Sequence, residues 1–206
     1  MPQIKGKIFG VLAPHAGYIY SGKVAACSFK TVLNKSFERV ILIGVSHQQI
    51  FEGLSLWSEG SWITPLGEVE VDEEFSQKLS ENFKNVGKAP HLFEHCLEVE
   101  IPFLQLTLKP GFKIVPILLG SKDLELIKKL GKFLKENLFE KETLIVASSD
   151  LSHYPPAEIA KVADKEVLKA ILSKEIEVLE KTILRLSLQF PEVDTFLCGR
   201  SAVEVL

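Results

Sequence analysis

Short, continuous apolar runs recur along this chain, and most of them are too short to be helices. Residues 8–12, 39–45, 112–120 and 143–147 are runs of this kind, rich in Ile, Leu and Val. They lack the alternation of a half-exposed strand, so we expect strands that are buried on both faces, as in parallel sheets. Helical periodicity between the runs predicts an α/β fold, with a mostly parallel or mixed central sheet and helices on both faces.

Capping residues mark where the intervening helices begin. Ser21, Asp72 and Ser121 are the predicted N-caps, because their side chains can accept a hydrogen bond from the first turn. Pro102 should kink its helix or open a new segment, and a break is expected near Ser173. The expected helices cover residues 22–29, 73–83, 93–105, 122–137, 156–188 and 201–206.

One segment departs from the α/β pattern. Residues 54–57 and 62–64 flank a short polar connection of the kind that joins the strands of a β-hairpin. We expect an antiparallel edge or flap here. Trp57 and Trp62 either form the wall of a pocket or pack on the core at the edge of the sheet.

Composition narrows the class of protein. The 206 residues are 46% hydrophobic and 25% charged, with a net charge of -3. One domain over residues 1–206 is expected, and the lack of a basic surplus argues against a nucleic-acid partner. No apolar run reaches the roughly 20 residues that cross a bilayer, and residues 1–7 lack a signal-peptide pattern. We therefore expect no membrane partner and a cytoplasmic location.

The three cysteines, Cys27, Cys96 and Cys198, are too few and too odd in number for a disulfide framework, which fits a reducing compartment. Cys198 precedes an expected helix and stands near Arg200. A helix N-terminus and a guanidinium both favour the thiolate form of cysteine. The alternative is that Cys198 is a small core residue.

Candidate chemistry gathers where the apolar runs end. His15 and His47 each follow such a run, and Asp150 and His153 follow a third. A single histidine of this kind is typical of a hydrogen-bonded loop residue. Three of them after adjacent parallel strands would meet at one edge of the sheet, where ligands bind in open α/β folds. Histidines that converge with an aspartate indicate a metal site or an acid–base site.

A further acidic segment carries a histidine. Glu94 and Glu98 are four residues apart and would share one face of the expected helix over residues 93–105, while His95 points elsewhere. His95 either orients a ligand from behind or is a hydrogen-bonded structural residue.

Six motifs occur in an order that resembles the Memo family, whose bacterial and archaeal members are called AmmeMemoRadiSam system protein B. The motifs are Ala13-Pro14-His15-Ala16-Gly17-Tyr18, Gly44-Val45-Ser46-His47, Thr64-Pro65-Leu66-Gly67, Glu94-His95-Cys96-Leu97-Glu98, Ser148-Ser149-Asp150-Leu151-Ser152-His153 and Cys198-Gly199-Arg200. The resemblance covers nearly the whole chain. It also implies that an N-terminal segment and the region after the Cys-Gly-Arg motif are missing, which would leave a sheet edge unpaired.

The resemblance implies a fold akin to the class III extradiol ring-cleaving dioxygenases. In that relation His15 and His47 match two histidine ligands of a metal ion, and Cys198 stands where the dioxygenases have a glutamate. His153 matches their acid–base histidine. Glu94 and His95 would support the ligands from behind. The resemblance further implies a functional association with a radical SAM protein and an AMMECR1-like protein.

Three functions stay open at this point. Two histidines and a thiolate can hold iron, copper or zinc. With iron or copper, redox chemistry of the dioxygenase type is expected, with His153 moving a proton and Asp150 either orienting His153 or completing the metal shell. With zinc, a hydrolase is expected. The third is a binding module without catalysis, because eukaryotic Memo proteins are associated with phosphotyrosine peptides. Ser148, Ser149 and Ser152 lack the Gly-x-Ser-x-Gly context of a serine hydrolase.

Overall fold

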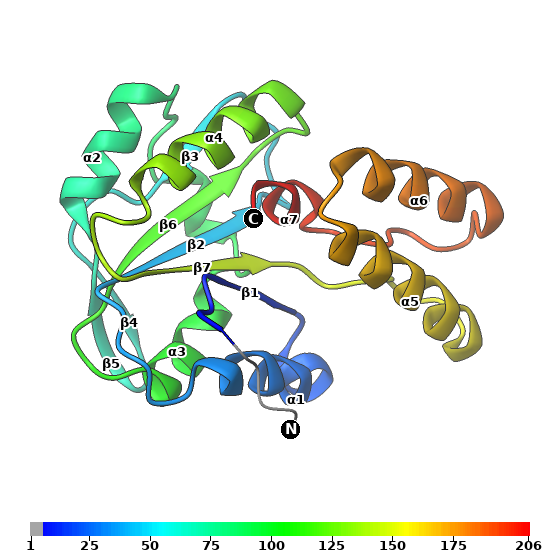
Figure 1. The fold of residues 1–206 in the computed structure, drawn as a ribbon, viewed down its shortest axis with the longest axis horizontal. Coiled ribbons are helices and arrows are strands. Elements are labelled where there is room, and N and C mark those ends of the chain that lie inside the picture. The colour runs from blue at the N-terminus through cyan, green and yellow to red at the C-terminus, as the bar shows by residue number, and fades with distance from the viewer. Residues whose placement is uncertain (1–5) are drawn as a thin grey trace.

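The computed structural model describes residues 6–206, and its centre is a five-stranded mixed sheet with helices on both faces (Figure 1). The expectation about residues 1–7 falls largely outside the described part of the chain. The sheet has the strand order β1-β7-β2-β6-β3, and a second sheet pairs β4 with β5. The predicted α/β fold class is confirmed. The strands are β1 (Gly10–Ala13), β2 (Arg39–Val45), β3 (Leu54–Leu56), β4 (Ser61–Thr64), β5 (Gly67–Glu70), β6 (Lys113–Leu119) and β7 (Thr143–Ser148).

Seven α-helices occur in the described part of the chain, together with three short 3-10 helices. The α-helices are α1 (Tyr18–Phe29), α2 (Glu73–Asn82), α3 (Ile101–Thr107), α4 (Leu124–Asn137), α5 (Ala157–Ser173), α6 (Ile176–Gln189) and α7 (Arg200–Val205). The 3-10 helices are η1 (Lys30–Val32), η2 (Ala89–Phe93) and η3 (Glu98–Glu100). The predicted break near Ser173 is confirmed, because α5 ends at that residue.

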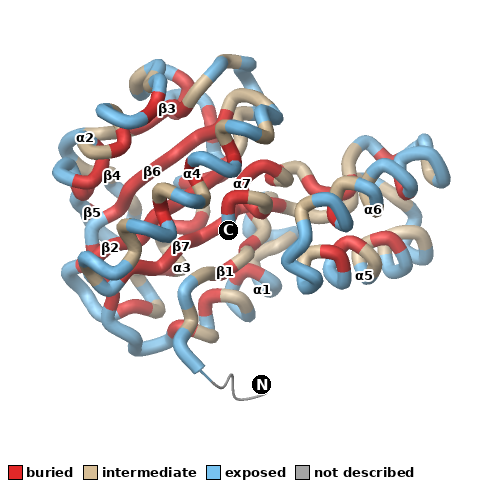
Figure 2. The backbone as a smooth tube through the Cα atoms, turned by 45° about the horizontal axis from the view of Figure 1, so that its top comes forward, coloured by how far each residue is buried: buried red, intermediate tan, exposed pale blue. Residues whose placement is uncertain are grey.

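The side chains of the central strands alternate between two cores, which the red strands of Figure 2 separate. Leu42 and Val146 belong to the core that contains α1 and α3, whereas Ile43 and Ala147 belong to the core with α2, α4 and α7. Both sets of side chains are removed from water, which accounts for the continuous apolar runs in the sequence. Strand β1 is different: it alternates between buried and half-buried residues, because it lies at the sheet edge and pairs with β7 alone.

Parallel pairing sets the position of the strand ends. Strand β7 pairs in parallel with both β1 and β2, with Ala13 opposite Ser148 and Ile43 opposite Ala147. The carboxyl ends of β1, β7 and β2 therefore meet at one edge of the sheet. Only β3 runs antiparallel in this sheet, beside β6.

The predicted hairpin between residues 54–57 and 62–64 is wrong. Strand β3 joins the main sheet as an antiparallel edge, and β4 pairs with β5 instead. The turn between β4 and β5 is shorter than the connection between β3 and β4. Gly67, where the turn ends, has a positive φ of 118°. The ring centroids of Trp57 and Trp62 lie 5.5 Å apart, edge to face, and both side chains pack against the core, the second of the two expected arrangements.

Two helix boundaries also differ from expectation. Gly17, not Ser21, is the N-cap of α1, and the Ser21 hydroxyl donates to the carbonyl of Ala16. Asp123 replaces Ser121 as the N-cap of α4, because its carboxylate accepts from two backbone N–H groups of the first turn.

The segment over residues 93–105 is not one helix. Glu94 is extended after η2, so it does not share a helix face with Glu98, and α3 begins at Ile101 with Pro102 in its first turn. Pro102 thus opens a new segment, one of its two predicted effects.

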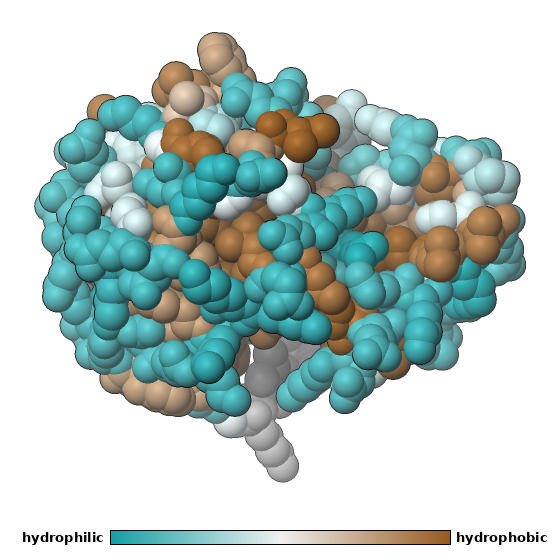
Figure 3. All heavy atoms as spheres, turned by 90° about the horizontal axis from the view of Figure 1, so that it is seen from above, coloured by the Kyte–Doolittle hydropathy of each residue, from teal (hydrophilic) through white to brown (hydrophobic). Residues whose placement is uncertain are grey.

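The face seen in Figure 3 is mostly hydrophilic, and apolar side chains are exposed at several places on it, including the part that carries α5 and α6. Leu172, Leu184 and Leu188 are among the exposed residues there. Within residues 6–206, no helix has the length and apolar character required to cross a membrane.

A buried ion pair joins β2 to α2. Arg39 is 2% exposed, and its Nε donates to Oδ2 of Asp72 at 2.8 Å while its guanidinium lies over the ring of Phe75. Asp72 is the predicted N-cap of α2, and its other oxygen accepts from the backbone N–H of Phe75. The pKa of Asp72 is lowered because the hydrogen bonds from Arg39 and Phe75 outweigh the effect of burial, which acts in the opposite direction.

Asp72→Ala should therefore lower the free energy of unfolding by about 3–5 kcal/mol, since it leaves a buried guanidinium without its partner. Asp123→Ala is the matched control, because Asp123 caps α4 from an exposed position and should cost about 1 kcal/mol. Urea unfolding of both variants measures the difference. Equal losses would show that Asp72 acts only as a helix cap.

Candidate metal centre

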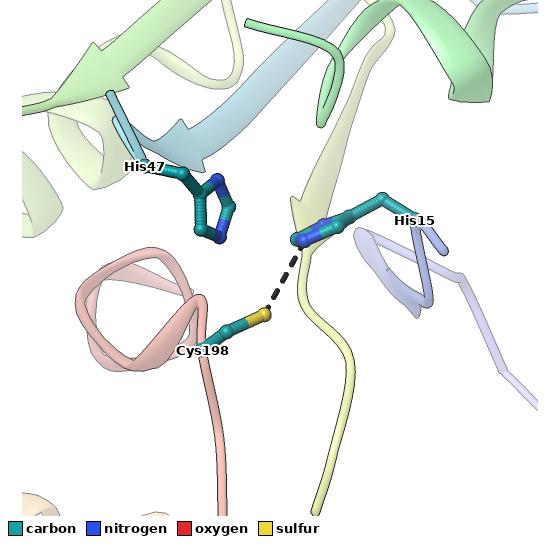
Figure 4. Close-up of side chains that lie close together, drawn as sticks. All are labelled: His15, His47 and Cys198. Carbon is teal, nitrogen blue, oxygen red and sulfur yellow. Dashed lines mark hydrogen bonds between the residues drawn. The ribbon is translucent and has the colours of Figure 1, made fainter. Parts of the chain in front are cut away.

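Three side chains from distant parts of the sequence meet beyond the carboxyl ends of β1 and β2 (Figure 4). They are His15 after β1, His47 after β2, and Cys198 directly before α7. Each offers one ligand atom, and these atoms lie within 4.8 Å of one another. The spacing allows all three atoms to contact one ion, because bonds from zinc to nitrogen and sulfur are about 2.0–2.3 Å long.

The ring of His15 is held on both sides. Its Nδ1 lies 2.8 Å from the hydroxyl of Ser148, the last residue of β7, and its Nε2 lies 3.3 Å from the sulfur of Cys198. His15 is 2% exposed. The parallel pairing of β1 with β7 thus sets the orientation of the imidazole, and Nε2 is the nitrogen that faces the centre.

The ring of His47 is oriented by Glu94. One carboxylate oxygen of Glu94 lies 3.1 Å from Nδ1 of His47, and the other accepts from the His47 backbone N–H at 2.7 Å. Burial would raise the pKa of Glu94, but the hydrogen bonds from His47 and Cys96 outweigh it and hold that pKa at about 2. Hydrogen bonds to Cys198 and Glu94 raise the pKa of His47 to about 10.

Cys198 is a thiolate at neutral pH. Burial would raise its pKa, but hydrogen bonds from His15 and His47 lower it to about 5. The backbone N–H of Asp150 also points to the sulfur, at 3.2 Å. Arg200 plays no part in this shift, contrary to expectation, because its guanidinium pairs with Glu180 and Glu204. The histidines supply the stabilisation that was predicted for Arg200.

Gly199 permits the close approach that places Cys198. A Cβ atom at this position would lie 2.1 Å from the carbonyl oxygen of Ser148, a distance too short for any residue other than glycine. The backbone N–H of Gly199 donates to the hydroxyl of Ser149 at 2.8 Å. The turn before α7 can therefore lie directly on the end of β7.

Asp150 and His153 lie near the same sulfur. One ligand atom from each lies within 4.8 Å of the Cys198 sulfur and of the other. Nδ1 of His153 lies 2.9 Å from the carbonyl oxygen of Leu151, which can only accept, so Nδ1 carries the proton of the neutral ring. The Nε2 of His153 is then free to accept a proton. Asp150 contacts the backbone N–H of Ala16 at 3.2 Å and Nε2 of His15 at 3.7 Å.

Of the two supporting residues, Glu94 touches a ring of the centre, as described, and His95 lies beside it. The ring of His95 is 5.8 Å from that of His15 and 5.9 Å from that of His47, with its side chain half exposed. Cys96 is buried, and burial raises the pKa of its thiol well above the ordinary range. Its S–H lies 3.4 Å from the carbonyl of Val45, so Cys96 acts as a neutral core residue.

Two residues that the sequence did not single out for this site complete it. Ser148 holds Nδ1 of His15, and the carboxyl group of Glu100 contacts the Ser148 hydroxyl at 2.9 Å. Glu100 is fully buried. The signal that could have identified it is its place between Val99 and Ile101, two apolar residues, directly before a helix.

Comparisons with known proteins identify the family of this chain. A profile of the Memo family, described as "Memo-like protein", matches residues 1–206. A "MEMO1 family protein" from Aquifex aeolicus is 43% identical over 82% of this chain and 63% of its own length. Another, from Nitrosopumilus maritimus, is 38% identical over 82% of this chain and 62% of its own length. The chain thus spans less than two thirds of the length of these relatives.

The ionisation of Cys198 can be measured by thiolate absorbance in the ultraviolet. The absorbance should fall with a midpoint at about pH 5 on acidification, because the histidine hydrogen bonds favour the thiolate above that pH. The Cys198→Ser variant should lack this step. The stability that the thiolate contributes should be complete above the ordinary thiol pKa of about 8.5 and should be lost as the pH falls from there to about 5. A step only near the ordinary thiol value, about 8.5, would contradict the assignment.

Proposed function

This chain belongs to the Memo-like protein family, and we propose that it binds one metal ion through His15, His47 and Cys198 and uses it for redox chemistry on a small-molecule substrate. The observation that carries the proposal is the convergence of the three ligand atoms within 4.8 Å. Substrate, metal and partners are all part of the proposal.

The residues fit a metal ion in chemistry as well as in spacing. The contacts of Ser148 and Glu94 with the two Nδ1 atoms leave each Nε2 facing the centre, where a bound ion would take the place of the proton on that nitrogen. The third donor is already a thiolate. Two imidazoles and a thiolate suit iron, copper and zinc, and we favour iron or copper, which would supply electron-transfer chemistry at this site.

The neighbouring side chains fit roles in proton transfer. Nε2 of His153 is free because Nδ1 binds the carbonyl of Leu151, so His153 can accept a proton from a bound substrate and return it. Asp150 contacts His15 and the Ala16 backbone. This favours a place for Asp150 at the open side of the metal shell over a role in orienting His153.

Zinc is the second candidate, because the same three donors bind it well. Zinc would supply an activated water, and His153 would act as the base of a hydrolase.

A module for phosphotyrosine peptides is less well supported: the thiolate of Cys198 and the carboxylates of Glu94 and Asp150 would repel a phosphate group. An association with a radical SAM protein and an AMMECR1-like protein belongs to the proposal on the strength of family resemblance.

Elemental analysis of protein purified without oxygen tests the centre directly. We expect about one ion per chain, and Cys198→Ser and His47→Ala should each weaken metal binding by more than about tenfold. Cys27→Ser is the matched control, since Cys27 is exposed on α1. Iron or copper favours redox chemistry, whereas zinc favours hydrolysis. Unchanged binding in Cys198→Ser would remove the thiolate from the ligand set, and a protein that binds no metal would favour the peptide module.

A second experiment separates His153 from the ligands. His153→Ala should keep the metal content of the wild type while any turnover found in a substrate screen falls by about a hundredfold or more, because only proton transfer is removed. Metal analysis and turnover are measured on the same preparation. Loss of the metal would make His153 a ligand.

A further inference from the structure

The hydroxyl of Ser148 makes three short contacts, all away from solvent. Its oxygen lies 2.8 Å from Nδ1 of His15, 2.6 Å from the backbone carbonyl oxygen of Cys96 and 2.9 Å from Oε1 of Glu100. A hydroxyl group has one proton to donate and two lone pairs with which to accept. Each short contact requires a proton between its two atoms.

Counting protons assigns all three contacts. The carbonyl oxygen of Cys96 has no proton, so the contact of 2.6 Å uses the single proton of Ser148. The other two partners must then donate to the lone pairs of Ser148. His15 therefore carries its proton on Nδ1, and Glu100 is a carboxylic acid with its proton on Oε1.

The surroundings of Glu100 support the neutral form independently. The residue is fully buried, and its second oxygen, Oε2, has no hydrogen-bond partner among the described residues. A buried carboxylate with one unpaired oxygen would be costly, whereas a carboxylic acid carries no charge there. Burial raises the pKa of Glu100 to about 8, the contact with Ser148 acts in the opposite direction, and the charge of Asp150 adds to the rise.

We propose that Glu100 is a neutral acid that, through Ser148, fixes a proton on Nδ1 of His15 and so positions the ring with Nε2 toward Cys198. Glu100 does not touch the centre, so it is a positioning residue. The protonation pattern stands on the geometry alone, and its consequence for metal binding rests on the proposed function. A charged Glu100 would compete for the proton of Ser148 and would add a negative charge to a site that already holds Glu94, Asp150 and the thiolate of Cys198.

Infrared difference spectra of the metal-free protein at neutral pH test the state of Glu100. The carboxylic-acid carbonyl band should be present in the wild type and lost in Glu100→Gln. Glu98→Gln, two residues away and exposed, is the matched control and should leave the band unchanged. A carboxylate band that disappears in Glu100→Gln would overturn the proposal.

The tautomer of His15 is read separately, by ¹⁵N NMR of histidine-labelled metal-free protein. The proton should be on Nδ1 in the wild type, and Ser148→Ala should reduce this preference because the acceptor is removed. A wild-type His15 whose Nδ1 carries no proton would also overturn the proposal. Neither spectrum needs a bound metal, so both remain informative if the proposed function fails.

Zinc affinity then tests positioning. Glu100→Gln should bind within about threefold of the wild type, since an amide N–H can donate to Ser148, whereas Glu100→Met has no donor and should bind about tenfold more weakly. Equal losses in Glu100→Gln and Glu100→Met, or no loss in Glu100→Met, would refute the positioning role. If Glu100→Met does not fold, the two spectra and Glu100→Gln decide.

Discussion

Parallel pairing of β1, β7 and β2 is the constraint on which the whole centre depends. The pairing brings three carboxyl ends to one edge of the sheet, and each end carries a polar residue into the loop that follows. His15 and His47 thus lie with their ring centroids 5.2 Å apart although the strands before them are separated by β7. Shifting one strand by a single residue would turn its side chains to the opposite face and disperse the site.

The sequence predicted most of the architecture because strands that are buried on both faces are continuous apolar runs, which are easily recognised. Strands β2, β6 and β7 are almost entirely buried and read as unbroken apolar runs. Prediction failed where several local solutions compete. Strand β4 could pair with the strand before it or the strand after it, and the choice depends on β3 having a place beside β6.

The candidate site was predicted in part for a related reason. His15, His47, Asp150 and His153 stand directly after strands, so topology alone could bring them together, while Cys198 was connected to them through family resemblance. Ser148 and Glu100 were missed because their significance is a contact between residues 48 positions apart in the chain. The sequence around Glu100, which lies between Val99 and Ile101, does not show whether its side chain points to solvent or into the core.

The centre also shows how a fold can set the orientation of two imidazole rings. Glu94 and Ser148 each occupy the Nδ1 side of one imidazole, and the opposite side of each ring faces the sulfur of Cys198 (Figure 4). The orientation therefore comes from the fold itself, which reduces the rearrangement that a bound ion would require. The acids around the rings hold opposite charge states for different reasons: hydrogen bonds keep Glu94 ionised, and burial keeps Glu100 neutral.

The distance along the chain between His15 and Cys198, 183 residues, has a consequence for the order of events during synthesis. The first histidine leaves the ribosome long before the cysteine does, and the three side chains cannot meet until the turn before α7 lies on the end of β7. A nascent or damaged chain consequently offers only scattered single donors, which hold metals weakly. Tight binding of the proposed ion would thus require a completely folded chain, and incompletely folded chains would not hold the ion at this site.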